Sequence, residues 1–567
     1  MLVATVVLIE MVAVSKLHRR LLTVMMVAMT TILAFAASPE TARAADAGAI
    51  TIGGDVATQY DAYQLFSATV TDKAGSDQKV ATDLAWASDA ARQAVLPVLY
   101  DAEFDSSAST AQEAAEWLNA DGHMSTALAA RLACAICNAG AASVPLNAGT
   151  TAELPCGYWL IVADDDAIDQ GEAGTAPIMA LVGGGAVTVK PKAATPKVAK
   201  HVLEDGTAAW QKAADATVAD DLYWRLSATA PAGLTAYDTY AVRFVDTMSA
   251  GLGPSKVAAS MRVYVAAGAD GGFDAVSAGR DGRAGTEPAK GWTDITAQCA
   301  TKVAADGKTF TVRTGDLIAA LGGADAFTAG ARVVAVYNAP LNSACNHGIA
   351  KGNPNEVYLR YPRSPLADQS GDAGFTRTPS DDACAYTWDL ALTKRGSDGD
   401  KPLAGAVLSI ADDRGRTLAA DGTWDVEGKA TVTTGEDGRV TVSGVDSGKL
   451  EVRELKAPKG YTAFEGTRSV TVKAEGLDVD QVAAAKPKLA ITAESPLRAD
   501  SADGSTGSLE ASLINTPTGT PPSITTGGFM PSTGDMAMYA AAAAAVAGAA
   551  LIVVALLVKR GGGSHKE

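Results

Sequence analysis

The C-terminal end of the chain carries its strongest structural constraint. An apolar run from Met536 to Val558 is closed by Lys559-Arg560 and a short polar tail. A helix of about 20 apolar residues crosses the hydrocarbon core of a bilayer, and a basic pair stays on the cytoplasmic side of such a span. Residues 535–567 are therefore predicted to form a membrane anchor with its tail, and the folded part of the chain is predicted to lie outside the membrane.

The N-terminal end of the chain predicts export. Basic residues at 16–20 precede an apolar run over 21–37, and Ala42-Arg43-Ala44 has the small-x-small pattern of a cleavage site. We therefore expect residues 1–44 to be a secretory signal peptide. A further apolar stretch before the basic residues leaves Met11 as an alternative start.

Composition and motifs exclude several classes of function. The net charge is −17 at pH 7, whereas a surface that binds nucleic acid needs a basic excess. The five histidines are scattered without metal-ligand spacing, and the sequence has no Gly-x-Ser-x-Gly, P-loop or zincin motif. We therefore expect no metal, no cofactor, no nucleic-acid partner and no enzymatic activity.

The stretch between the two signals is too long for a single hydrophobic core. Its first part mixes helical and strand patterns, and the rest consists of short apolar strands separated by Gly, Asp and Asn turns, which is typical of β-sandwiches. The predicted fold class is mainly β, with tandem immunoglobulin-like β-sandwich domains after a mixed α/β N-terminal domain. The predicted divisions are 45–192 for the N-terminal domain, 193–380 for the middle domain, 381–519 for the third domain and 520–534 for a Pro-rich linker with a short motif at its end.

Local patterns in the N-terminal domain predict individual elements. Strands are expected over Ala49–Ile52 and Tyr60–Val70, and a buried strand over Tyr158–Val162. Helices are expected over Thr110–Asn119, with Ser109 or Thr110 as the N-cap, and over Ser125–Cys137.

Six cysteines permit disulfides outside the cell, although six allow fifteen pairings. Cys299 and Cys345 both lie in the middle region and are the candidate pair. A redox role for Cys134-x-x-Cys137 is not favoured, because its Ala-rich helical surroundings lack the βαβ context of such motifs.

Polar residues continue the inward face of several predicted strands in the third domain. Side chains alternate along a strand, so a residue two positions beyond an apolar one points the same way. The polar residues in question are Lys394 after 388–392, Glu454 after 450–452 and Asn515 after 509–513. A lone buried charge is costly, so we expect these groups to satisfy one another.

The same groups could react. Burial lowers the pKa of a lysine and raises that of a carboxylic acid. A neutral Lys394 amine can then attack the Asn515 carboxamide while Glu454 polarises the carbonyl and moves protons, which gives an amide bond and ammonia. The alternative is a buried ion pair with a capping asparagine.

The surroundings of Glu454 resemble a known motif. Residues 453–461 (RELKAPKGY) are similar to the E-box of pilin subunits. With Lys394 and Ile514–Pro517 they resemble the Cna-B-type domain, in which an intramolecular Lys–Asn isopeptide bond forms. The resemblance implies a Cna-B-like β-sandwich in the third domain, with a bond from Lys394 to Asn515 that Glu454 promotes.

The middle domain resembles the fimbrial isopeptide-forming domain. Lys200 and Asp246 both lie in the inward register of apolar strands, and the resemblance assigns them the amine and the catalytic carboxyl. The closing segment Tyr361–Pro365 departs from the family pattern because it has no asparagine. Asn355 or Asn342 could be the acceptor; without a bond, Lys200 and Asp246 would form a buried ion pair.

A short motif precedes the predicted anchor. Met530-Pro531-Ser532-Thr533-Gly534 resembles the LPxTG cell-wall sorting signal of Gram-positive surface proteins, with Met530 in the Leu position. The resemblance implies cleavage between Thr533 and Gly534 and transfer of the Thr533 carbonyl by a sortase to an amine. The alternative is a tail anchor that is never cut.

A lysine motif lies between the first two predicted domains. Val187–Lys192 (VTVKPK) resembles the pilin motif V-x-x-Y-P-K, whose lysine attacks the sortase thioester of the next subunit. Lys192 matches that lysine, and Lys190 replaces the tyrosine and is a rival nucleophile. The alternative is a basic interdomain linker.

Taken together, the resemblances imply a sortase-assembled backbone pilin of the SpaA/SpaH type. Such a chain would be secreted, anchored to peptidoglycan at the cell wall and polymerised with identical subunits, and it would support adhesion. Ancillary pilins and host surface ligands are further implied partners. The alternative function is a monomeric wall-anchored adhesin or an ancillary (minor) pilin.

Overall fold

The computed structural model describes residues 47–53, 59–120, 122–191, 195–231, 234–267, 291–323, 326 and 330–519. The predicted signal peptide, Lys192, the motif at 530–534 and the predicted membrane anchor lie outside these residues. Within the described ranges, no helix is both long enough and apolar enough to cross a bilayer.

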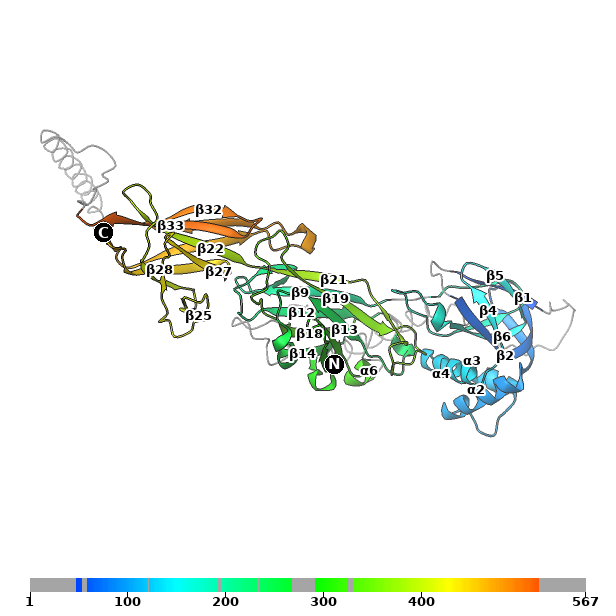
Figure 1. Ribbon diagram of the computed structural model, residues 1–567. Helices are drawn as coiled ribbons and strands as arrows, with labels where there is room; N and C mark the ends of the chain where they lie inside the picture. The colour runs from blue at the N-terminus through cyan, green and yellow to red at the C-terminus, as the bar shows by residue number, and fades with distance from the viewer. Residues whose placement is uncertain are drawn as a thin grey trace, which may run out of the picture.

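The sheets are arranged in a row of separate packed units (Figure 1). The N-terminal elements lie at one end, the middle sheets follow, and the C-terminal sheets lie at the other end. Strands dominate each unit, so the predicted mainly β fold class is confirmed.

The N-terminal unit has helices on one side of a sheet and a second small sheet on the other. The larger sheet runs β3 (Lys79–Trp86), β2 (Gln59–Asp72), β6 (Gly157–Ala163), β7 (Ile178–Val182), with β4 (Ser143–Asn147) also paired to β2. The smaller sheet runs β5 (Thr151–Pro155), β1 (Ala47–Ile52), β8 (Val187–Val189). Every residue of β6 is buried, because one of its faces packs against the helices and the other against the smaller sheet.

The helices of this unit are α2 (Asp89–Asp101), α3 (Ala111–Asn119) and α4 (Thr126–Asn138). Thr110 caps α3 in a capping box with Glu113, and Ser125 caps α4, so the predicted strands and helices of this region are confirmed to within a few residues. Helix α2 was not predicted.

The middle unit is a sandwich of two sheets. One sheet runs β10 (Ala209–Gln211), β9 (Lys197–Glu204), β12 (Tyr223–Thr229), β18 (Arg332–Asn338), β14 (Arg262–Ala266), β15 (Thr293–Asp294). The other runs β11 (Ala213–Asp215), β21 (Asp381–Tyr386), β19 (Asn353–Pro362), β13 (Arg243–Met248), β17 (Thr309–Arg313), β16 (Ala300–Val303), with β20 (Phe375–Arg377) on β19. The inward faces of both sheets form one core.

The C-terminal unit is a second sandwich. One sheet runs β27 (Arg439–Val445), β22 (Trp388–Gly396), β33 (Ser508–Pro517), β29 (Tyr461–Thr462), with β32 (Leu497–Asp503) on β33. The other runs β25 (Trp424–Asp425), β24 (Thr417–Leu418), β23 (Val407–Ala411), β28 (Gly448–Lys456), β30 (Thr467–Glu475), β31 (Lys488–Ala493), with β26 (Val432–Thr433) on β23. Strands β22 and β33 are parallel neighbours.

Strand β21 corrects the predicted boundary at residue 381. It pairs with β19 and β11, so it belongs to the middle sheet. Its side chains alternate between two cores, with Ala383 and Ala385 in the middle core and Cys384 and Tyr386 in the C-terminal core. The buried residues 383–386 of this strand are all apolar or aromatic, as is usual where a strand is buried on both faces. Their pattern therefore gives no sign of the domain to which the strand belongs.

The predicted disulfide between Cys299 and Cys345 is wrong. All six cysteines lie within the described residues, and none forms a disulfide. The Cys299 thiol donates to the carbonyl of Ile295, whereas the Cys345 sulfur faces His347. The two thiols therefore have different neighbours, although both pack at the edge of the middle core.

Candidate functional site: two buried lysine–carboxyl–asparagine clusters

The first cluster lies inside the C-terminal sandwich and consists of Lys394, Glu454 and Asn515. Lys394 on β22 pairs in register with Leu513 of β33, and Asn515 stands two residues further along β33, opposite Gly396. Glu454 reaches them from β28 in the facing sheet. Their exposed fractions are 0, 6 and 2%, so the alternation that the sequence predicted brings all of them into the core. We call this group the C-terminal cluster.

The carboxylate of Glu454 lies between the amine and the carboxamide. Lys394 Nζ is 3.2 Å from Glu454 Oε1, and Asn515 Nδ2 donates to Oε1 and Oε2 at 2.9 and 3.0 Å. Among the described residues, nothing donates a hydrogen bond to the buried Asn515 Oδ1. Burial lowers the pKa of Lys394 to about 8, although the nearby Glu454 acts in the opposite direction. A neutral amine is therefore accessible near physiological pH.

The second cluster lies inside the middle sandwich. Lys200 on β9 forms a buried ion pair with Asp246 on β13, and both side chains are fully buried. Tyr337 on β18 donates to Asp246 Oδ2 at 2.9 Å and accepts from Lys200 Nζ at 2.9 Å. Asn355 Nδ2 also donates to the Tyr337 hydroxyl, at 2.9 Å. We call Lys200, Asp246, Tyr337 and Asn355 the middle cluster.

Burial moves both charged groups of the middle cluster toward their neutral forms. It lowers the pKa of Lys200 to about 8 and raises the pKa of Asp246, against the pull of the neighbouring lysine. Asp246 Oδ1 and Asn355 Oδ1 are buried, and no described residue donates to them. The group thus contains an amine, a carboxyl and a carboxamide, as the C-terminal cluster does, with a tyrosine added.

Asn355, rather than Asn342, is the asparagine that the structure places beside Lys200 and Asp246. Asn355 pairs with Met248 across β13 and β19 and is completely buried. Asn342 lies outside the core, and its carboxamide donates to the carbonyl of Ala250. Tyr337 was missed by the sequence reasoning, although Val333, Ala335 and Tyr337 alternate on one buried face of β18, and a hydroxyl in that register is a signal of a polar core partner.

The structure describes the lysine motif at Val187–Lys192 only as far as residue 191. Val189 is buried at the end of β8, and Lys190 directly after it is exposed. Lys192 and residues 530–534 lie outside the described ranges, so the sorting and polymerisation residues stay predictions.

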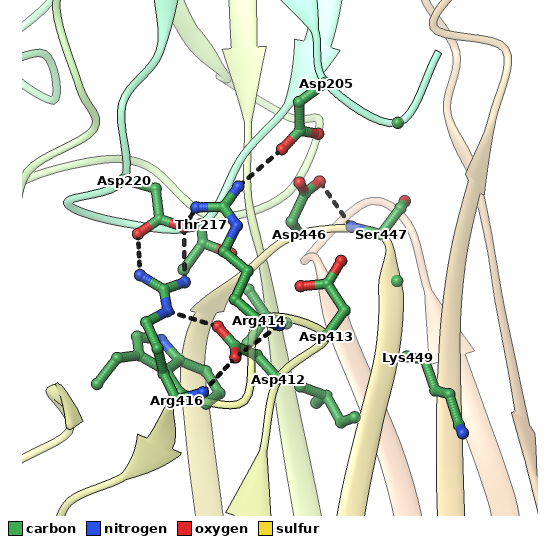
Figure 2. Close-up of a pocket in the computed structure, with 15 residues that line it drawn as sticks. Asp205, Thr217, Asp220, Asp412, Asp413, Arg414, Arg416, Asp446, Ser447 and Lys449 are labelled. Atoms are coloured by element: carbon green, nitrogen blue, oxygen red, sulfur yellow. Dashed lines mark hydrogen bonds and ion pairs between the residues drawn. The ribbon is translucent and has the colours of Figure 1, made fainter. Parts of the chain in front are cut away.

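A charged pocket lies where the middle and C-terminal units meet (Figure 2). Arg414 and Arg416 of the C-terminal unit reach across to Asp220 of the middle unit, and Arg414 also pairs with Asp205. The cavity is about 120 Å³, well below the roughly 300–1,000 Å³ of typical small-molecule sites. We interpret it as part of a domain junction.

Carboxylates gather at the edge of this pocket. Oxygens of Glu204, Asp205 and Asp446 lie within 4.8 Å of one another. Burial, with the negative charge of Asp215 next, raises the pKa of Glu204 to about 8. A proton held by Glu204 near neutral pH lowers the repulsion across the junction.

Comparisons with known proteins address the C-terminal unit most directly. A family model described as SpaA, prealbumin-like fold domain, matches residues 389–486. This segment therefore carries the prealbumin-like fold of that family. The matched residues include Lys394 and Glu454, while Asn515 lies beyond them.

One curated relative and several solved structures are similar to the chain. The trypsin-resistant surface T6 protein of Streptococcus pyogenes serotype M6 is 31% identical over 143 residues, which are 24% of this chain and 24% of that protein. The chain thus matches about a quarter of the length of this relative. The T6 backbone pilin of serotype M6 S. pyogenes has 16% identity, with 83% of this chain and 98% of that chain covered and a TM-score of 0.45. The full-length major pilin SpaD from Corynebacterium diphtheriae has 15% identity, 83% and 97% coverage and a TM-score of 0.40.

Proposed function

We propose that the chain is a backbone subunit of a covalently assembled pilus, anchored to the cell wall of a Gram-positive bacterium. The observation that carries the proposal is the pair of buried clusters, one in each sandwich, in which a lysine amine, a carboxyl and an asparagine carboxamide meet. The SpaA family match over 389–486 and the identity to a streptococcal surface protein support it.

In the C-terminal cluster, the geometry favours an intramolecular amide bond. The neutral Lys394 amine attacks Cγ of Asn515, the Lys Nζ–Asn Cγ bond forms, and the Cγ–Nδ2 bond breaks. Glu454 contacts both nitrogens, so it can take the proton from the amine and give it to the departing ammonia. The step consumes no co-reactant, and it happens once per chain, so the chain acts as its own substrate and not as an enzyme.

In the middle cluster, Asp246 and Tyr337 together would transfer the proton from the amine to the leaving nitrogen. Asp246 contacts the Lys200 amine, and the Tyr337 hydroxyl joins Asp246 to the nitrogen that leaves from Asn355. A bond from Lys200 to Asn355 would tie β9 to β19, which belong to opposite sheets of the sandwich. Both internal bonds would hold under tension and under reducing conditions, as a fibre exposed to flow requires.

Between subunits, the proposed bond joins Thr533 of one chain to a lysine of the next. A sortase would cut between Thr533 and Gly534 and transfer the threonine carbonyl to Lys192, or to Lys190, which is exposed. The last subunit would be transferred to peptidoglycan. Identical subunits, a sortase and the wall are therefore the proposed partners, with the cell surface as the location.

The test is the size of the chain in cell-wall extracts of the bacterium that expresses it. A ladder of high-mass bands that disappears in Lys192→Ala and persists in Lys190→Ala supports head-to-tail assembly through Lys192. The reverse result moves the nucleophile to Lys190. A single band in the wild type, still released by wall hydrolases, would replace the proposal with the monomeric adhesin or ancillary pilin.

A further inference from the structure

A third polar cluster lies at the junction between the middle and C-terminal units and consists of Cys345, His347 and Asp389. The Cys345 sulfur is 3.5 Å from His347 Nε2, and His347 Nδ1 is 2.8 Å from Asp389 Oδ1. The cysteine and histidine stand on the loop after β18, and the aspartate stands on β22. None of these residues belongs to the two clusters described above.

The contacts fix which ring nitrogen of His347 carries the proton. A carboxylate can only accept, so Nδ1 donates to Asp389, and in the neutral imidazole the lone pair of Nε2 faces the thiol. The thiol of Cys345 therefore donates to Nε2. A nucleophile bonded to a base that is oriented by a third group is the arrangement that activates cysteine and serine nucleophiles.

The aspartate and the loop are both held in place. Asp389 Oδ1 also accepts from Ser443 Oγ at 2.6 Å and from the Gly444 amide at 3.0 Å. The loop is tied to the C-terminal unit by the Gly348 amide, which donates to the carbonyl of Thr387 at 3.1 Å. A Cβ at Gly348 would lie 2.5 Å from the Gly507 nitrogen, so the two backbones approach closely. The cluster is complete only while the two units are docked.

At rest, Cys345 is a thiol. Burial, with the negative charge of Asp389 next, raises its pKa. Because the thiolate is the reactive form of cysteine, a thiol of this kind reacts slowly at neutral pH unless a neighbouring base takes its proton. His347 is the base in contact with it, and its side chain is 26% exposed.

The surroundings favour one kind of electrophile. Acyl transfer needs hydrogen-bond donors aimed at the oxyanion. The two backbone amides at this loop are already engaged, since the amide of Cys345 donates to the carbonyl of Asn342 and the amide of Asn346 donates to Asn353 Oδ1. Thiol–disulfide exchange needs only an accessible sulfur and a proton acceptor. Cys345 is partly exposed, which suits a small disulfide.

We propose that Cys345 is a thiol-exchange site for low-molecular-weight disulfides, with His347 as its base and Asp389 as a positioning residue. In the exchange, His347 takes the thiol proton as the Cys345 sulfur attacks one sulfur of the disulfide. A new S–S bond forms to Cys345, the old S–S bond breaks, and the departing thiolate takes the proton from His347. The result is a mixed disulfide and one free small thiol, with no net change in oxidation state. The site is independent of pilus assembly.

The test is the rate at which the secreted chain (residues 45–534) takes up 2-hydroxyethyl disulfide, read at each cysteine by peptide mass mapping from pH 5 to 10. At pH 7 we expect Cys345 to react at least tenfold faster than Cys134, which is exposed on α4. Between pH 7 and 9 its rate should rise by much less than tenfold per pH unit, because His347 takes the thiol proton during the attack. A rate that climbs tenfold per pH unit throughout this range, as for an unaided thiol below its own pKa, would overturn the proposal.

Variants distinguish the loss of the base from a loss of the folded structure. His347→Gln and Asp389→Asn should each slow Cys345 at pH 7 by about tenfold or more, a modest share of the effect of a general base, and leave Cys134 unchanged. His123→Gln is the matched control. The buried Cys384 on β21 reports folding, because it stays protected while the junction is intact. If Cys345 reacts at the wild-type rate in His347→Gln while Cys384 stays unreactive, the role of His347 is contradicted. If Cys384 becomes reactive, the variant has lost its fold, and the proposal is then judged from the pH profile of the wild-type chain.

Discussion

The carboxamide nitrogen of Asn515 lies 2.9 and 3.0 Å from the two oxygens of Glu454. The nitrogen that would leave as ammonia is thus already bonded to the group that would protonate it. The same carboxyl is 3.2 Å from Lys394 Nζ, so the proton lost by the nucleophile and the proton gained by the leaving group can pass through one residue.

Intact mass is the most direct readout of the proposed bonds. The folded chain is expected to be lighter than its sequence mass by two molecules of ammonia, one for each cluster. In Glu454→Ala the mass deficit should fall to one ammonia, because the C-terminal cluster has lost the group that transfers the proton. Glu451→Ala, an exposed position on the same strand, should leave the deficit at two. A wild-type chain of full sequence mass would reject the bonds and leave two buried ion pairs.

The acceptor in the middle domain is a separate prediction. Asn355→Ala is expected to remove one ammonia loss, and Asn342→Ala to remove none, because only Asn355 reaches the Tyr337 hydroxyl. Tyr337→Phe removes the link between Asp246 and the leaving nitrogen and should slow bond formation during refolding. Mass spectra taken over time after refolding measure that rate; equal rates in Tyr337→Phe and wild type would show that Tyr337 only packs.

The bond in the C-terminal unit should contribute strongly to stability. It closes a loop of about 120 residues, for which the loop-entropy relation used for disulfides gives about 4–5 kcal/mol. Asn515→Ala should therefore lower the guanidinium midpoint of the C-terminal unfolding step in proportion, and Asn342→Ala should not. Trypsin digestion is a second readout, since the wild-type chain should be cleaved more slowly than Asn515→Ala. Equal midpoints would mean that no loop is closed.

A variant that cannot form the bond should gain stability with rising pH. In Asn515→Ala the buried Lys394 keeps a folded-state pKa of about 8 against 10.5 when exposed, so between these values the unfolded chain binds one more proton than the folded chain. Stability then rises with pH across this window, by up to about 1.4 kcal/mol per unit, and the gain is absent below pH 8. Guanidinium unfolding at pH 8, 9 and 10 measures how the free energy of unfolding changes with pH. In the double variant Lys394→Met/Asn515→Ala this free energy should change much less over the same range.

Asp215 should be a strong determinant of the junction. Its Oδ2 accepts from Trp388 Nε1 at 2.6 Å and from the amide and hydroxyl of Ser447 at 3.0 and 2.5 Å. Asp215→Ala leaves the fully buried indole N–H without this partner, which costs about 1–3 kcal/mol. We expect faster hydrogen exchange at β21 and β22, with exchange in the N-terminal unit unchanged as an internal control. Unaltered exchange at the junction would show that packing alone holds it.

Much of the fold and of both clusters could be predicted from the sequence, because strand alternation is a strict geometric rule. Lys394, Glu454 and Asn515 each continue an apolar register, and the structure brings them together in the core. The rule also places Asn355 inward with Val357 and Leu359, although Asn355 and Asn342 were both open as acceptors from the sequence alone.

Features set by tertiary contacts were not accessible in this way. The pairing of β21 depends on which sheet lies beside it, and an apolar strand that is buried on both faces carries no mark of its partner. The cysteines were assigned by position along the chain, while disulfide formation depends on the distance between their Cβ atoms. The cluster of Cys345, His347 and Asp389 forms across a domain junction, so the spacing of these residues along the sequence does not predict it.

Strand β21 has a consequence for how such chains can be rearranged. Because its alternate residues complete two different cores, a cut on either side of it leaves one unit without part of its interior. A hybrid that joins one of these units to a foreign neighbour must therefore also carry matching residues on β11 and on the loop around Gly348.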